Sequence, residues 1–413
     1  GVFILGYASM QVWIRRFALL LLPLGFLAVM VAAPLLSLAF YDGEGAWAEV
    51  VTDDYMRLRL GWTVAQAVLT CVLVTALGVP AAWVLARMDF AGRRMVLRLL
   101  MLPFVMPTLV AGMGVLALFG AHGMLAAGWQ DTPWLLIYGN VFFNLPVLVR
   151  SAYQGFVRVP QARLLSAQSL GADAWRRFVW VEWPVVRAWV AGGVCLVFLY
   201  CFSGFGLALL LGGERFATVE VEIYRLVAYE LDMARASVLV WLVLAVTAAA
   251  GGLYAYWSRR VAVDKSVSPL PPRAPVRAWE KWLTATVLAM LVLCCLLPLA
   301  AVWLKAAAAG SSWAVLLEAQ TWAAAWNTIR FSAAAVAAAT VLGVLYAAAA
   351  RQMAWLRALM FLPFMVSPVC IAFGVLLLYP QWTASLWLLT ATYALLAYPF
   401  VAKDVLAAWD GLP

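Results

Sequence analysis

The stretch LPFVMPTLVAGMGVL (102–116) has a near copy much later in the chain, LPFMVSPVCIAFGVL (362–376). Aligning the two stretches matches Pro103 with Pro363 and Gly114 with Gly374. Self-similarity at a fixed separation is typical of transporters that are built from structural repeats. The pair therefore predicts a chain made of two related halves.

Two further segment pairs extend the repeat: TALGVPAAWVLAR (75–87) with TVLGVLYAAAAR (340–351), and NLPVLVRSAYQGFVRVP (144–160) with AYPFVAKDVLAAWDGLP (397–413). The shift between matched segments spans six predicted helices, an even number, so both halves run in the same direction across the membrane. We therefore expect two parallel six-helix repeats. On this alignment the second repeat stops after about four helices, so the chain is expected to be truncated.

The composition indicates that the repeats lie in a lipid bilayer. Of 413 residues, 67% are hydrophobic and 11% are charged, whereas soluble domains are roughly 45–50% apolar and about 25% charged. A helix needs about 20 apolar residues to cross a bilayer. The sequence therefore predicts an all-α polytopic membrane protein with ten spans at 17–41, 61–86, 99–120, 134–156, 186–212, 236–257, 282–304, 327–350, 358–379 and 386–408.

The basic residues orient these spans, because loops rich in Lys and Arg stay in the cytoplasm. A cytoplasmic N-terminal segment (1–16) places most of the 28 Lys and Arg residues on one side, and the acidic clusters near 42–54 and 214–232 on the other. The expected location is a bacterial inner membrane. This asymmetry accounts for the net charge of +9, so no nucleic-acid partner is needed to explain it.

The repeat and the loops divide the chain into domains. The first half covers 17–257 and contains a polar segment at 158–187. A linker at 258–281, rich in proline and cations, is expected to be extended and cytoplasmic. The incomplete second half covers 282–413.

The polar segment 158–187 cannot lie in hydrocarbon, since each charge costs roughly 2.5–3.5 kcal/mol at mid-bilayer and the segment carries several. Pro160 suits a first helical turn, and Gly171 suits a helix end. Asp173 then favours a new helix start as its cap. We expect two short cytoplasmic helices joined at Gly171.

The second of these helices is expected to have an apolar face. Trp175, Phe178 and Val179 fall at i, i+3 and i+4, with Arg176 and Arg177 on the flank. Such a helix could rest on lipid headgroups, or it could dock a cytoplasmic protein. The residues alone leave both interpretations open.

The spacing from Gly171 to Phe178 and Pro184 resembles the coupling loop of ABC importer permeases, in which Glu-Ala-Ala, three residues and Gly precede a hydrophobic stretch ending in Leu-Pro. In this chain Leu165 stands at the position of the Glu, and Trp183 stands at the position of the Leu. The absence of the Glu puts in doubt any salt bridge that the Glu would make. The resemblance implies an ATPase-coupling loop made of Ser166, Ala167, Gly171, Ala172, Asp173, Trp175, Arg176, Arg177, Phe178 and Pro184.

Three more stretches, VFFNLPVLVRS (141–151), FVWVEWP (178–184) and LLLGGERFATVEVEIYRLVAYELDMARAS (209–237), resemble the permeases of thiamine and thiamine pyrophosphate importers. Two-half ferric-iron permeases share this layout. The resemblance implies a type I ABC importer permease fold that translocates thiamine by alternating access. It also implies membrane lipid, a periplasmic substrate-binding protein and two copies of a cytoplasmic ABC ATPase subunit as partners.

The sequence lacks the residues for ATP hydrolysis or other catalysis. It contains no Gly-Lys dipeptide and hence no Gly-x-x-x-x-Gly-Lys-Ser/Thr phosphate loop. The six cysteines fall within predicted spans without ligand spacing, and the single histidine, His122, lies in an outer loop. We therefore expect no catalytic residue, metal site or cofactor on this chain, with ATP and Mg bound by the partner ATPase.

Candidate pathway residues lie in two places. Asn140 and Asn144 are polar groups within a span, where they either face the pathway or bond a neighbouring helix. In the outer loop 214–235, an apolar stripe including Tyr224 runs beside Glu220 and Glu222. This loop is expected either to dock a partner or gate the pathway, or only to pack as an interfacial helix.

Two other classes of protein compete with an ABC permease. A twelve-helix secondary transporter would commonly place ionisable residues at mid-membrane, yet the ten spans carry no Asp, Glu, Lys or His near a centre. That pattern argues against proton coupling, although not against sodium coupling. An integral-membrane enzyme would need a carboxylate pair or a nucleophile with its base, and the sequence shows neither.

Overall fold

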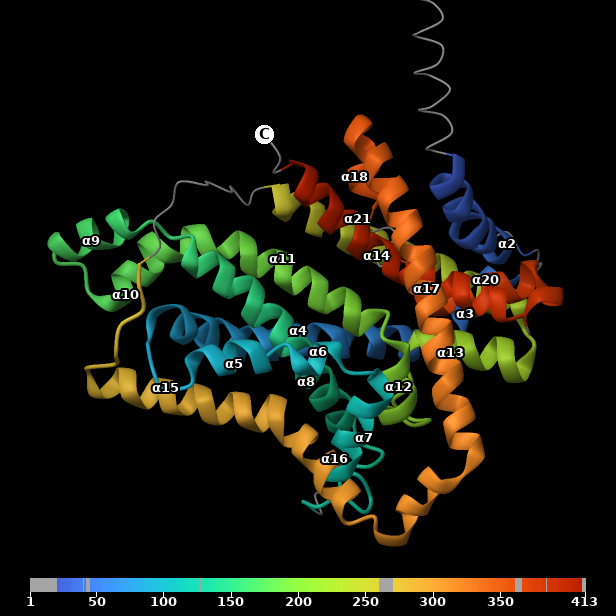
Figure 1. Ribbon diagram of the computed structural model, residues 1–413, viewed down its shortest axis with the longest axis horizontal. Helices are drawn as coiled ribbons and strands as arrows, with labels where there is room; N and C mark the ends of the chain where they lie inside the picture. Colours follow the sequence, from blue (N-terminus) through green and yellow to red (C-terminus); the bar gives the residue numbers. More distant parts are fainter. Residues whose placement is uncertain are drawn as a thin grey trace, which may run out of the picture. The chain divides into compact units, whose positions relative to one another are not determined.

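The structure is a computed structural model that describes residues 21–39, 41, 45–125, 128–259, 270–360, 366–383 and 385–410. Helices account for nearly all of these residues, as Figure 1 shows. The described residues contain no named strand, and they form one isolated β-bridge, between Met88 and Arg273. The prediction of an all-α protein is confirmed.

Among the described residues, eight helices are long and apolar enough to cross a membrane. Each coincides with one of the predicted spans, and several begin or end well outside the apolar run that predicted them. They are Leu21–Leu38, Asp54–Arg87 (α4), Pro133–Val157 (α8), Ala174–Phe202 (α10, η2 and α11), Met233–Trp257 (within α14, Met233–Arg259), Ala278–Ala307 (α15, η4 and α16), Ala319–Gln352 (α17) and Leu386–Asp410 (α21).

The predicted span 99–120 is instead a bent pair of helical segments. Arg93–Val105, which contains α5 (Arg93–Leu99) and α6 (Leu102–Val105), meets α7 (Thr108–Phe119) at 104°. The break falls at Met106, whose ψ of 146° is extended. A residue before proline is driven out of the helical region, and Pro107 offers no N–H to continue the hydrogen bonds.

The predicted span 358–379 is also interrupted near a proline. Its described parts are α18 (Ala354–Leu359) and α20 (Pro368–Leu378), while residues 361–365 lie outside the described residues. Ser367 is extended and caps α20, because its hydroxyl accepts a hydrogen bond from the Cys370 amide at 3.3 Å. A serine–proline pair thus starts a helix inside an apolar run that composition alone predicted to be continuous.

Contacts group the chain into two compact units. The larger unit contains residues 51–222 and 245–309. In it α4, α8 and α11 (Trp183–Phe202) pack along one another, α15 (Ala278–Leu291) packs on α4, and α16 (Leu297–Ala307) packs on α7. Apolar side chains of α7, α8 and α12 (Phe205–Leu211) form one hydrophobic cluster of this unit.

The second unit contains described residues up to 50 together with 223–244 and 310–410. In it α17 packs along α21, and α2 (Ala33–Ala39) packs on α20. Tyr346 and Tyr398 are buried between α17 and α21 with ring centroids 5.5 Å apart. Among the described residues outside the polar segment 158–187, the other short elements are η1 (Ala28–Ala32), α3 (Ala46–Thr52), α13 (Val219–Arg225), η3 (Leu226–Glu230), η4 (Val292–Leu296), η5 (Gly310–Leu317) and η6 (Pro380–Trp382).

The glycines matched by the repeat make equivalent contacts, one in each unit. A Cβ added to Gly114 would lie 2.7 Å from the carbonyl oxygen of Pro298, and one added to Gly374 would overlap the carbonyl oxygen of Pro34. Pro298 and Pro34 belong to the first span of each sequence half. In each unit, therefore, the first span of one half packs against later helices of the other half.

Gly114→Ala and Gly374→Ala are each expected to destabilise the protein by about 1–3 kcal/mol, because a backbone carbonyl cannot yield as the end of a side chain can. The matched control is Gly252→Ala in α14, where an added Cβ meets nothing within 4 Å and alanine is the better helix former. Thermal unfolding in detergent measures the three variants. Equal stability of all three would contradict the close approach.

Candidate functional site

The polar segment 158–187 folds as a helical hairpin. Helix α9 (Gln161–Ser169) begins after Pro160 and ends in a turn at Gly171, whose φ of +80° is left-handed. The carboxylate of Asp173 then accepts a 2.7 Å hydrogen bond from the Arg176 amide and caps α10 (Ala174–Arg177). The predicted helix end at Gly171 and helix start at Asp173 are confirmed as local structure.

One feature of the hairpin differs from the prediction, because the second helix is not a separate short helix. It continues through a π-helical turn, η2 (Phe178–Glu182), into α11. Pro184 lies in the first turn of α11, where its missing N–H is tolerated. The turn therefore joins the polar segment directly to the helix that carries a candidate membrane span, and this helix begins at Ala174, ahead of the apolar run that was predicted to start at residue 186.

The hairpin exposes large apolar side chains. Leu170, Trp175 and Trp180 are 88%, 71% and 78% exposed, so they contribute little to the core of the fold. Together with the exposed Leu165 they form what we call the coupling surface (Leu165, Leu170, Trp175, Trp180). Phe178 lies on the same face as Trp175, as predicted, and the two rings stack with centroids 5.9 Å apart. Phe178 is half-buried, because it also stacks on Phe156 at 6.3 Å.

The predicted coupling residues all lie on this hairpin or at its junction with α11. Ser166, Ala167, Leu170, Trp180 and Pro184 are among the residues that line a shallow cavity of about 490 Å³. The amide of Ala172 donates to the Ala167 carbonyl at 3.0 Å and closes the turn. Arg176 is exposed, while Arg177 donates a 3.1 Å hydrogen bond to the Gln168 side chain.

A buried ion pair that the sequence did not predict anchors the hairpin. Arg87, at the end of α4, donates from Nε to Glu182 Oε1 at 2.8 Å, and the indole of Trp83 donates to Glu182 Oε2 at 2.9 Å. Arg87 also donates from Nη2 to the Phe156 carbonyl at 3.1 Å. Arg87 and Glu182 are 6% and 4% exposed, so the pair fixes η2 against α4.

The described end of the linker, residues 270–277, lies along the same end of α4, and we call it the strap. Its Arg273 exchanges backbone hydrogen bonds with Arg87 (3.0 Å) and Asp89 (2.8 Å). Directly after the strap, Trp279 stacks on Trp83 with ring centroids 6.1 Å apart. The linker is thus extended over its described part, and it is held to the helix that also holds the hairpin.

The carboxylate of Glu280 secures the end of the strap. It is 2% exposed and accepts hydrogen bonds from the Arg273 guanidinium and from the amides of Val276 (3.0 Å) and Arg277 (3.2 Å). These bonds also cap α15 at its N-terminus, where a negative charge is favourable.

Asn140 and Asn144 take part in a buried polar network. Asn140 donates to the Gln66 side chain of α4 at 2.7 Å, and Gln66 donates to the Cys201 carbonyl of α11 at 2.9 Å. Asn144 donates to the Asn140 carbonyl at 2.9 Å, and its own Oδ1 has no partner among the described residues. The contacts join neighbouring helices, and a role in a pathway stays a prediction.

Glu222 is buried beside two side chains of α4. It accepts a 3.0 Å hydrogen bond from the Tyr55 hydroxyl and lies 3.9 Å from Arg59 Nε. Glu220 is fully buried. These contacts tie the start of α13 to the start of α4.

Tyr224 belongs to the second compact unit. Its hydroxyl lies 3.4 Å from that of Tyr229, and this hydrogen bond raises the pKa of Tyr224. The predicted apolar stripe of the outer loop is divided, because Val221 and Val227 are buried whereas Leu231 is exposed. A role for this loop in docking or gating stays a prediction.

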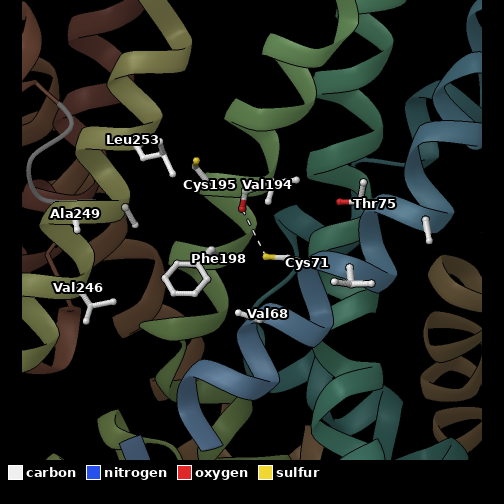
Figure 2. Close-up of a pocket in the computed structure, with 12 residues that line it drawn as sticks. Val68, Cys71, Thr75, Val194, Cys195, Phe198, Val246, Ala249 and Leu253 are labelled. Atoms are coloured by element: carbon white, nitrogen blue, oxygen red, sulfur yellow. Dashed lines mark hydrogen bonds between the residues drawn. The ribbon is translucent and has the colours of Figure 1, made fainter. Parts of the chain in front are cut away.

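An apolar cavity between α4, α11 and α14 does not suit a charged molecule. Figure 2 shows twelve lining residues of α4, α11 and α14 around a space of about 830 Å³. Thr75, Cys71 and Cys195 are the only ones with a polar side-chain atom, and the Cys71 thiol donates to the Val194 carbonyl at 3.7 Å. Hydrocarbon, such as a lipid acyl chain, suits this lining.

Comparisons with known proteins concern the segment around the hairpin and, for some relatives, most of the chain. Residues 75–263 match the family described as binding-protein-dependent transport system inner membrane component. The thiamine transport system permease protein ThiP of Salmonella typhimurium is 30% identical over 339 residues, which are 79% of this chain and 61% of that protein. The chain thus spans about three fifths of that relative's length.

Two other similarities cover part of the chain. The sulfate transport system permease protein CysW of Synechocystis sp. is 29% identical over 210 residues, which are 48% of this chain and 76% of that protein. A chain of a bacterial alginate ABC transporter, solved in complex with an alginate pentasaccharide-bound periplasmic protein, aligns with a TM-score of 0.52. That alignment has 15% identity and covers 62% of this chain and 97% of the other, so it shows a shared fold.

Proposed function

We propose that this chain, whose residues 75–263 match the family of binding-protein-dependent transport system inner membrane components, is the membrane-spanning permease of an ATP-driven importer. The observation that carries this proposal is the coupling surface. Its apolar side chains are exposed, they lie inside the segment that matches the family, and a buried ion pair anchors their hairpin. A solvent-exposed apolar patch on a rigid support is typical of a protein-docking site.

In the proposed mechanism the hairpin lies in the cytoplasm, as does the N-terminus, and receives an ABC ATPase subunit that binds ATP and Mg. Closure of the ATPase would push the coupling surface. The movement would pass into α11 through the continuous turn at η2, and into α4 through Arg87 and Glu182. Alternating access then follows as a rigid-body change between two arrangements of packed helices.

The internal repeat supports two copies of the ATPase for each transporter, with one for each half. A periplasmic binding protein would deliver the cargo at the opposite face, since the alginate transporter of similar fold was solved with such a partner. We assign possible roles in the pathway or gate to Asn140, Asn144, Glu220, Glu222 and Tyr224. The chain supplies the pathway, and the chemistry of ATP belongs to the partner.

The proposed cargo is thiamine or thiamine pyrophosphate. The thiamine permease matches over 79% of this chain, and the sulfate permease over 48%. The ferric-iron permeases remain the alternative on the basis of their two-half layout.

The cargo proposal is tested by uptake in a strain from which the gene has been deleted. Restoring the intact gene is expected to restore uptake of labelled thiamine and to leave sulfate and ferric-iron uptake unchanged. The matched control is the same strain carrying the empty vector. Restored uptake of sulfate or iron without thiamine would contradict the proposal.

A further inference from the structure

A second cavity, of about 270 Å³, lies beneath the strap, where the strap, α4 and the hairpin meet. Its floor is buried and includes Arg87, Glu182 and Glu280. Its rim is more exposed and carries Arg177, Arg273 and Arg277 with Gln168. The strap therefore closes one side of a polar cavity that neither the helices nor the hairpin would form alone.

The charges around this cavity do not balance. Four arginines line it, but only two glutamates do. Arg87 pairs with Glu182, and Arg273 pairs with Glu280. The side chain of Arg177 bonds the neutral Gln168, and no lining carboxylate remains for Arg277. Among the described residues that form the lining, two positive charges thus lack a negative partner.

The buried arginine of the floor is also incompletely bonded. Arg87 uses Nε for Glu182 and Nη2 for the Phe156 carbonyl, whereas its Nη1 is buried without a hydrogen-bond partner among the described residues. An unsatisfied buried donor of a charged group costs free energy. An acceptor in this cavity, or a water held by one, would recover part of that cost.

We propose that the cavity binds a small dianion with phosphate-type oxygens. A dianion matches the two unbalanced charges, and the planar guanidinium fork suits phosphate oxygens in bidentate geometry. Of the rim arginines, Arg277 is exposed and Arg177 is held only by the neutral Gln168, so both can turn toward a ligand. The stacked rings of Trp83 and Trp279 offer an apolar wall to an attached organic group. A bound dianion would tie the strap to α10 and α4, and so restrain the hairpin.

Titration with inorganic phosphate and with pyrophosphate tests the site on the purified protein in nanodiscs of phosphatidylcholine. Isothermal calorimetry is expected to show saturable binding, and the double variant Arg177→Gln/Arg277→Gln is expected to weaken it by about tenfold or more. The charge-matched control Arg163→Gln/Arg176→Gln removes two exposed arginines of the same hairpin that do not line the cavity. This control is expected to change the dissociation constant less than about twofold, since exposed charges away from a site act weakly.

A second arm distinguishes a free phosphate from a lipid headgroup. If nanodiscs that contain phosphatidic acid, whose phosphomonoester headgroup is an anion of the same kind, abolish phosphate binding in competition, the headgroup is the source of the phosphate, and unchanged binding identifies a soluble anion. Absence of saturable binding in both lipids, or equal weakening in both double variants, would overturn the proposal. Because the readout is binding alone, failure here is distinct from failure of the transport proposal.

Discussion

Glu182→Ala is expected to destabilise the protein by about 3–5 kcal/mol and to abolish transport, because it leaves the Arg87 guanidinium buried without its carboxylate. Arg87 and Glu182 are both more than nine-tenths buried, and their 2.8 Å contact joins α4 to η2. The same change removes the acceptor of the Trp83 indole. Thermal unfolding in detergent and cargo uptake in proteoliposomes measure the two effects.

A second variant separates lost stability from lost coupling. Arg87→Met/Glu182→Leu removes both charges and is expected to regain much of the stability, since replacing a whole buried pair by apolar groups is often neutral. Uptake should stay low in this variant, because the polar link between α4 and the hairpin is gone. Full uptake with restored stability would show that the pair only supports the fold.

Leu170→Ser/Trp175→Ser is expected to weaken binding of the ABC ATPase by about thirtyfold, which corresponds to about 2 kcal/mol for losing two apolar anchors. Both side chains are largely exposed, so the thermal midpoint of the permease should not change. Surface plasmon resonance with the purified ATPase measures the affinity. Uptake should fall in parallel, since fewer transporters would carry the ATPase.

The control for this experiment is Trp387→Ser in α21, which removes an 84% exposed tryptophan far from the hairpin in sequence. Its ATPase affinity is expected to equal that of the unmodified protein. If Leu170→Ser/Trp175→Ser binds the ATPase with normal affinity, the coupling surface does not dock the ATPase. The alternative that the sequence left open, a helix that rests on lipid headgroups, would then be favoured. Charge reversal of Arg176, which is exposed and does not line the cavity beneath the strap, supplies an independent electrostatic test of the same hairpin.

The sequence predicted features that depend on neighbouring residues. Apolar runs predicted the spans because a bilayer imposes length and composition on a helix. Gly171 and Asp173 marked the hairpin because a left-handed turn and a helix cap need particular residue types. Even so, an apolar run does not reveal a bend, so the 104° break at Met106 went unpredicted although Pro107 was visible in the quoted repeat.

Contacts between residues that are far apart in the chain could not be predicted from the sequence. Arg87 and Glu182 both stood in quoted motifs, yet only the packing of α4 against α11 brings them together. Likewise, the match of Gly114 with Gly374 predicted a repeat. It did not reveal that each glycine packs against the backbone of the first span of the other half. A repeat alignment shows which positions are equivalent, but it does not show which residues each position contacts in the folded protein.

We propose that ATP hydrolysis on a separate subunit drives transport by this protein through its hairpin. The most direct measurement is thiamine uptake into proteoliposomes that contain the intact transporter, its ABC ATPase and its binding protein, with and without enclosed ATP. We predict accumulation only with ATP, and loss of accumulation in Leu170→Ser/Trp175→Ser. Accumulation without ATP, driven by a sodium or proton gradient, would contradict the claim.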